Sequence, residues 1–188
     1  MTPQTESVKV RNWKVEPQDL GNDIFKFLWK TFDFPNGQYT LTVRAYDVRG
    51  RVGETSITVW VYNFSDVYVK KINHPSHGTR IPVNQTIVPR ATIKNVGTRP
   101  ETLKTVCFLI RQNGNTQYFR SLNYFPGKVL NPGNTVVCSF PGWTPTSFGL
   151  CSAKCYTYIA RDTNRCNDTA YSFFTVVEDR GDQESIRD

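Results

Sequence analysis

The chain has 188 residues, of which 38% are hydrophobic and 13% aromatic. This composition allows packed cores and excludes a wholly disordered chain, and no apolar run approaches the roughly 20 residues of a membrane helix. Its 23 Lys and Arg exceed its 16 Asp and Glu, for a net charge of +7. Because the basic residues are scattered singly along the chain, we expect no nucleic-acid partner and no membrane insertion.

The first predicted strand runs from Ser7 to Val15, and residues 16–22 predict a turn. A second strand follows, in which Phe25, Phe27 and Trp29 alternate with more polar neighbours. The alternation predicts that these three aromatic side chains face inward.

A long β-hairpin is predicted from Gly37 to Tyr62, with its turn at residues 47–53. Residues on one face of both strands are apolar and alternate with Thr, Ser and Arg. From this segment and the strand before it we predict the core residues Trp29, Tyr39, Leu41 and Val43.

The phrase from Pro35 to Asp47, followed by Val52-Gly53, resembles the second half of bacterial Ig-like surface domains. The resemblance extends over residues 7–62 and implies that residues 1–63 form a partial Ig-like β-sandwich that lacks its first strands. A truncated sequence, strands donated by another subunit and a smaller sheet would each explain the shortfall. We expect donation by another copy, since the apolar face is costly to leave in water.

The same plan returns between Gly149 and Val177, where a second alternating pair of strands flanks a polar turn. Trp143 precedes Gly149 much as Trp29 precedes Gly37, so we predict that the two tryptophans are equivalent core residues. Phe140 is a further predicted core residue. Residues 111–128 predict an extra edge hairpin around Asn113-Gly114-Asn115.

Residues 66–177 resemble the CARDB-like domains, which are cell-adhesion-related, fibronectin-III-like sandwiches. The phrases that carry the resemblance are Asp66 to Val69, Val88 to Gly97, Leu130 to Gly133, Phe140 to Thr144 and Asn167 to Thr169. The expected fold is therefore all-β, with two tandem Ig-like/fibronectin-III-like β-sandwiches. Residues 64–178 form the second sandwich, Asn63-Phe64-Ser65 is a short linker, and residues 179–188 are a polar C-terminal tail.

Five cysteines permit at most two disulfides. Cys107 and Cys155 fall on strands that are expected to pair, which makes them a candidate disulfide, and buried free thiols are the alternative. Cys151 and Cys155 lack the spacing of a zinc knuckle.

No catalytic constellation is recognisable in the sequence, and no cofactor is implied. His74 and His77 fall in a loop rich in Pro and Gly. Asp162, Asn164 and Asp168 are weak calcium candidates, because Asx residues are also the ordinary material of turns.

Asn63, Asn84 and Asn167 each begin an acceptor sequence for N-glycosylation. Arg180-Gly181-Asp182 spells an integrin-type tripeptide, which we interpret as accidental.

Together these observations predict a non-enzymatic structural or adhesive protein, extracellular or at the cell surface, that assembles with other copies of itself into a prokaryotic filament or stalk. One alternative is an accessory module of a secreted hydrolase that binds surface polysaccharide through Tyr46, Trp60 and Tyr62. Another is a virion fibre or decoration protein.

Overall fold

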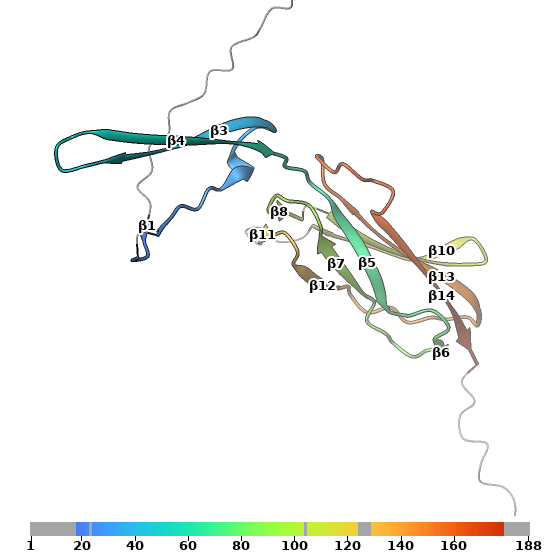
Figure 1. Ribbon diagram of the computed structural model, residues 1–188. Coiled ribbons are helices and arrows are strands. Elements are labelled where there is room, and N and C mark those ends of the chain that lie inside the picture. The colour runs from blue at the N-terminus through green and yellow to red at the C-terminus, as the bar shows by residue number, and fades with distance from the viewer. Residues whose placement is uncertain (1–17, 23, 104, 124–128, 179–188) are drawn as a thin grey trace, which may run out of the picture. The chain divides into compact units, whose positions relative to one another are not determined.

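The computed structural model describes residues 18–22, 24–103, 105–123 and 129–178 (Figure 1). The described regular structure is β-strand apart from one short 3-10 turn, in agreement with the predicted all-β class. The chain divides into two compact units, Met1–Phe34 and Pro35–Asp188. This division falls at Phe34 and not at Asn63, where the sequence places a domain boundary. The predicted strand from Ser7 to Val15 and the tail 179–188 lie outside the described residues.

The first unit contains little regular structure. Its strands β1 (Gln18–Asp19) and β2 (Phe25–Lys26) form a short antiparallel pair, and a 3-10 turn follows at Thr31–Asp33. The Trp29 ring packs edge-on against Phe34 at 5.1 Å between ring centroids but is only half-buried, and Phe27 is exposed. The predicted inward alternation therefore fails at Phe27, and strand pairing ends at Lys26.

The second unit begins with a two-stranded ribbon, β3 (Gly37–Tyr46) and β4 (Val52–Val61), which we call the β3–β4 ribbon. Its register runs without a bulge from Gly37 opposite Val61 to Tyr46 opposite Val52. Asp47 closes the turn, since its Oδ1 accepts the N–H groups of Arg49 and Arg51 at 2.9 and 2.8 Å. Gly50 has φ +78°, which glycine adopts without strain. The predicted hairpin is present in full.

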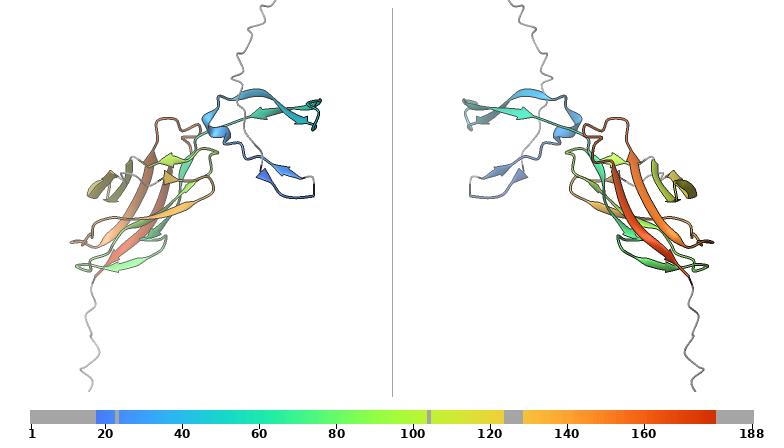
Figure 2. Two further views of the ribbon diagram at one scale, coloured as in Figure 1. Left: turned by 90° about the vertical axis from the view of Figure 1, so that its left-hand side faces the viewer. Right: turned by 90° about the vertical axis from the view of Figure 1, so that its right-hand side faces the viewer.

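The remaining strands form a β-sandwich, whose two main sheets lie as layers in the views of Figure 2. The larger sheet has the order β10-β9-β13-β14-β6, the smaller has the order β12-β7-β5, and β8 pairs with β11. The bounds are β5 Val67–His74, β6 Arg80–Pro82, β7 Arg90–Asn95, β8 Glu101–Thr102, β9 Thr105–Gln112, β10 Asn115–Asn123, β11 Val129–Leu130, β12 Thr135–Ser139, β13 Gly149–Tyr158 and β14 Thr169–Val177. The strands of the sandwich thus lie between Val67 and Val177, whereas the described strands before them form only the pairs β1–β2 and β3–β4.

The core lies between these two sheets. Ile93 and Phe108 are completely buried, and Phe140, 3% exposed, packs against Phe108 at 5.0 Å between ring centroids. Trp143, 8% exposed, packs against Phe174. Trp143 and Trp29 are therefore not equivalent, because only Trp143 lies in a packed core.

The extra edge hairpin consists of β9 and β10. Asn113 and Gly114 form its turn with φ +50° and +79°, the conformation that Asn-Gly turns favour. β10 is the outermost strand of the five-stranded sheet. The turn lies where the sequence predicts it, but the hairpin spans residues 105–123 and not 111–128, and residues 124–128 lie outside the described residues.

Candidate functional site

The two faces of the β3–β4 ribbon differ in composition. The register places Leu41 opposite Ile57 and Tyr39 opposite Val59, so the odd-numbered side chains form one apolar face. The opposite face is polar and includes a hydrogen bond of 2.8 Å between Thr42 Oγ1 and Ser56 Oγ. The predicted division into an apolar and a polar face is therefore present.

The apolar face of the ribbon is open to solvent in the part that lies nearer the turn. Val43 and Ile57, which are near neighbours across the two strands, are 66% and 61% exposed. The core prediction is therefore wrong for Val43, and Tyr39 and Leu41 are only half-buried. Exposed apolar surface costs roughly 25 cal/mol per Å² relative to burial.

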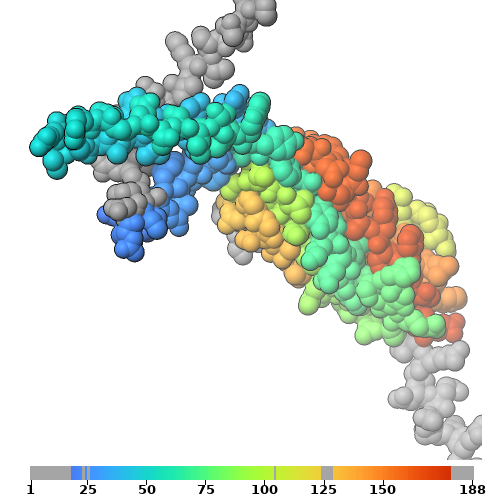
Figure 3. Space-filling view, in the orientation of Figure 1, coloured from blue at the N-terminus to red at the C-terminus, as the bar shows by residue number. Residues whose placement is uncertain are grey.

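Among the described strands, β3 and β4 pair only with each other. In the space-filling view the two strands lie against one another along their length (Figure 3). An isolated two-stranded ribbon is marginally stable in water, and its outer edges present backbone groups to which further strands can bind. The β3–β4 ribbon is therefore the candidate interaction site of this chain.

The base of the ribbon is fixed by reciprocal amide contacts. The Asn63 N–H donates to Asn36 Oδ1 at 2.6 Å, and Asn36 Nδ2 donates to the Asn63 carbonyl at 2.9 Å. The Tyr39 hydroxyl also donates to the Pro35 carbonyl at 2.8 Å. Both ends of the ribbon are thus closed, one by this pair and the other by Asp47.

The linker from Asn63 to Ser65 is bonded to the sandwich. The Phe64 N–H donates to Thr98 Oγ1 at 2.9 Å, and the Thr98 N–H donates to the Phe64 carbonyl at 3.0 Å. A Cβ on Gly97 would lie 2.7 Å from the Phe64 carbonyl oxygen and 2.8 Å from the Asp66 nitrogen. Residue 97 must therefore be glycine for the linker to pass this closely.

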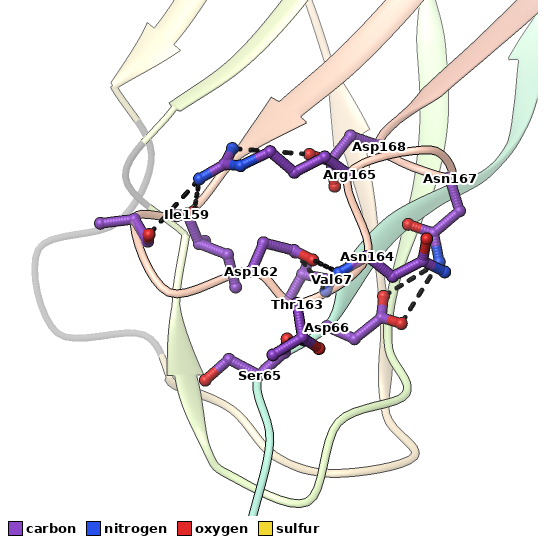
Figure 4. Close-up of polar contacts among 11 residues, drawn as sticks. Ser65, Asp66, Val67, Ile159, Asp162, Thr163, Asn164, Arg165, Asn167 and Asp168 are labelled. Atoms are coloured by element: carbon purple, nitrogen blue, oxygen red, sulfur yellow. Dashed lines mark hydrogen bonds and ion pairs between the residues drawn. The ribbon is translucent and has the colours of Figure 1, made fainter.

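A polar cluster joins the end of the linker to the turn between β13 and β14 (Figure 4). The Val67 N–H donates to Asp162 Oδ2 at 3.0 Å, and Asn167 Nδ2 donates to the Asp66 carboxylate at 3.0 and 3.3 Å. The Ser65 carbonyl accepts from both the N–H and the hydroxyl of Thr163 at 2.9 Å. These contacts join segments about a hundred residues apart, so no local pattern could have predicted them.

The calcium candidates take structural roles in this cluster. Asp162 uses Oδ1 to accept the Asn164 N–H at 2.8 Å, which is an Asx turn, and the Asn164 side chain is exposed. Among the described residues, no three His, Cys, Asp or Glu side chains are placed to hold a metal ion. The arrangement fits the turn interpretation better than a calcium site.

Asp168 is the electrostatically costly member of the cluster. It is 7% exposed, and its ion pair within the described residues, Oδ2 to Arg165 Nη1, is long at 3.8 Å. Burial, followed by the charge of Asp162, raises the pKa of Asp168 to about 6. The folded state therefore favours the protonated carboxyl more strongly than the unfolded state does.

The cysteines are free thiols, and all but Cys166 are buried. The candidate disulfide between Cys107 and Cys155 is wrong, because the two residues are offset by one position across the paired strands. Cys155 lies opposite Phe108 and Cys107 lies opposite Tyr156, so the two thiols point to opposite faces of the sheet. Burial raises the pKa of Cys138 to about 11 and also raises that of Cys155, which leaves both as inert apolar core residues.

The glycosylation acceptors differ in exposure. Asn84 is exposed, and Asn167 is partly buried with its amide bonded to Asp66. Asn63 is 7% exposed and takes part in the contact with Asn36, so the acceptor prediction fails there for the folded chain.

His77 is exposed, and its ring lies 6.2 Å edge-on from that of Phe173.

The aromatic residues proposed for sugar binding do not form a platform. Trp60 and Tyr46 share a face, but Trp60 lies opposite Gln38, eight residues before Tyr46, which separates them by roughly 26 Å. Tyr62 follows β4 and packs against Phe64 at 5.8 Å between ring centroids. A second group of exposed aromatic residues lies on the outer face of the five-stranded sheet, and the sequence analysis missed it. The period-two alternation from Leu150 to Tyr158 and from Thr169 to Thr175 would have indicated this group.

Comparisons with known proteins show similarity in structure alone. No protein-family model matches the sequence, and no curated protein matches it. The structure is similar to a crystal structure of the CARDB domain of PF1109 from Pyrococcus furiosus, in complex with di-metal ions, at 21% identity and a TM-score of 0.46, over 62% of this chain and 97% of that one. A β-glucosidase from Listeria innocua matches at 11% identity and TM-score 0.38, over 68% of this chain and 16% of that one. The β-glucosidase EmGH1 from Erythrobacter marinus matches at 12% identity and a TM-score of 0.39, over 71% of this chain and 18% of that one. Among the described residues, no helix has the length and apolar composition to cross a membrane.

Proposed function

We propose that this chain is a non-catalytic structural or adhesive module of a cell surface, and that a neighbouring copy completes its β3–β4 ribbon. The observation that carries the proposal is the exposed apolar face around Val43 and Ile57 on a ribbon whose strands pair only with each other in the described structure. Strands or an apolar surface from another copy would bury this face and use the free strand edges.

Repeated head-to-tail contact of this kind builds a filament where the rotation between neighbouring copies does not close a ring. The linker contacts support this role, because Phe64 and Thr98 hold the end of the ribbon to the sandwich by paired hydrogen bonds. A contact made at the ribbon would thus be transmitted to the sandwich of the same copy.

The matched pair Ile57→Asp and Thr58→Asp tests the proposal. The two residues are adjacent in β4 and both exposed, but Ile57 lies on the apolar face and Thr58 on the polar face. In light scattering over a range of protein concentrations, we expect the unmodified chain and Thr58→Asp to form species larger than a monomer and Ile57→Asp to stay monomeric, since a buried charge in the interface is costly. Equal behaviour of the two variants would contradict the proposal.

A further inference from the structure

The outer face of the five-stranded sheet carries a group of exposed rings that the core does not use. Phe119 on β10, Tyr158 on β13, and Tyr171 and Phe173 on β14 are 47%, 54%, 60% and 56% exposed. The strand register places Phe119, Leu109, Lys154 and Tyr171 in one row across four strands, with Phe173 and Tyr156 in the adjacent rows. We call this surface the aromatic face.

Cations lie among these rings. Lys154 Nζ lies 5.2 Å from the ring centroid of Tyr156 and 5.7 Å from that of Tyr171, which holds the ammonium at the middle of the aromatic face. At one end of the sheet, the Arg165 guanidinium lies 4.6 Å from the ring centroid of Tyr158. None of the strands β6, β9, β10, β13 and β14 contains an Asp or a Glu.

This charge distribution restricts the partner. Two copies that met through the aromatic face would bring like charges together without a compensating carboxylate, so self-association here is disfavoured. An acidic partner would instead pair with Lys154. The exposed rings further require a partner with apolar surfaces of similar size that can lie flat on them.

Two acidic polymers could meet both requirements, and the hydroxyl groups of the aromatic face distinguish them. A single-stranded nucleic acid carries a phosphate at every nucleotide and is bound along a positively charged groove. Of the four basic side chains on the five strands, Arg120 lies opposite the buried Phe108 and so on the inner face, which leaves Arg80, Arg111 and Lys154 for the aromatic face. A polysaccharide with one carboxylate per sugar also carries several hydroxyl groups on each sugar. The hydroxyls of Tyr156, Tyr158 and Tyr171 can form hydrogen bonds with these groups.

We propose that the aromatic face binds an acidic polysaccharide, with sugar rings stacked on Tyr171 and Phe173 and a sugar carboxylate paired with Lys154. The carboxylate would receive a charge-assisted hydrogen bond from an ammonium that the neighbouring rings already position. This site is separate from the β3–β4 ribbon and does not depend on assembly through it.

Binding of the full chain to polygalacturonate, to a neutral glucan of similar length and to a single-stranded oligothymidylate tests the proposal. We expect polygalacturonate to bind most tightly, and Tyr171→Ala and Lys154→Gln each to weaken it by about tenfold, a loss of about 1.4 kcal/mol. Trp60→Ala removes an even more exposed aromatic ring from the ribbon and should leave the affinity unchanged. Lys154→Gln removes the charge but keeps a polar side chain at a partly exposed position, so a loss of affinity with this variant reports the charge and not a folding defect.

Three results would overturn the proposal: no binding of polygalacturonate, binding that neither variant weakens, or equal binding of the neutral glucan. Tighter binding of the oligothymidylate would also overturn it and would assign the aromatic face to nucleic acid. Ile57→Asp separates this site from the ribbon, because it should abolish assembly while leaving polygalacturonate binding unchanged.

Discussion

Asn95 shows how a single side chain holds the sandwich together. It is completely buried, and its Nδ2 donates to the carbonyls of Arg99 and Leu130, both at 2.8 Å, while its Oδ1 accepts the Gly97 N–H at 2.9 Å. The carbonyls of Arg99, in the β7–β8 loop, and of Leu130, in β11, therefore depend on one amide, which also shares the Gly97 N–H with the Asp66 carbonyl. The phrase Lys94 to Gly97 carries part of the CARDB-like resemblance, and this network gives a physical reason for its Asn and its Gly.

Replacing Asn95 with Ala should lower the free energy of unfolding by about 2–4 kcal/mol, since the buried backbone groups lose their partner. Urea unfolding measures the loss. Asn123→Ala at the exposed end of β10 is the matched control and should change stability by less than about 0.5 kcal/mol. A similar small effect of Asn95→Ala would mean that water replaces the amide without cost.

Asp168 should make stability depend on pH. Its pKa of about 6 in the folded chain lies above the usual 3.8, so the folded state binds the extra proton and the unfolding free energy falls as pH rises from about 4 to about 6. Asp168→Asn removes this penalty and should stabilise the chain at pH 8 by of order 1 kcal/mol, a figure reduced for solvent screening. The gain should shrink at pH 4.5 in urea unfolding. Destabilisation at pH 8 would instead show that the contact with Arg165 outweighs the cost of burial.

At the scale of elements, alternation and turn residues were sufficient to predict the hairpins. The β3–β4 ribbon, the β9–β10 hairpin and the β13–β14 pair all lie where a period of two and Gly or Asn turns place them. Register was not predictable, because a shift by one residue reverses the face, as with Cys107 and Cys155. The extent of burial was not predictable either, since alternation defines an apolar face without defining what covers it, as Val43 shows.

The two tryptophans give an element-scale prediction. Trp143→Ala should cost about 3–5 kcal/mol, because it removes a buried ring packed on Phe174 between the sheets. Trp29→Ala, which removes a half-buried ring outside that core, should cost clearly less. Chemical unfolding followed by far-ultraviolet circular dichroism measures both. A larger loss for Trp29 would show that it supports more of the fold than its burial indicates.

For the whole molecule, the polar cluster could not be predicted, because it brings together Asp66 and the turn at residues 162–168 from opposite ends of the sandwich sequence. The same cluster and the bonds between Phe64 and Thr98 make the linker part of the sandwich. The proposed function therefore depends on what the ribbon contacts and not on motion in the linker.

Hydrogen–deuterium exchange of β3 and β4 at low and high protein concentration tests this account most directly. If a neighbouring copy completes the ribbon, its amides should exchange quickly when the chain is dilute and be protected when it is concentrated, while β9 and β13 stay protected throughout. Protection of β3 and β4 that is already complete in a dilute monomer would contradict assembly through the ribbon.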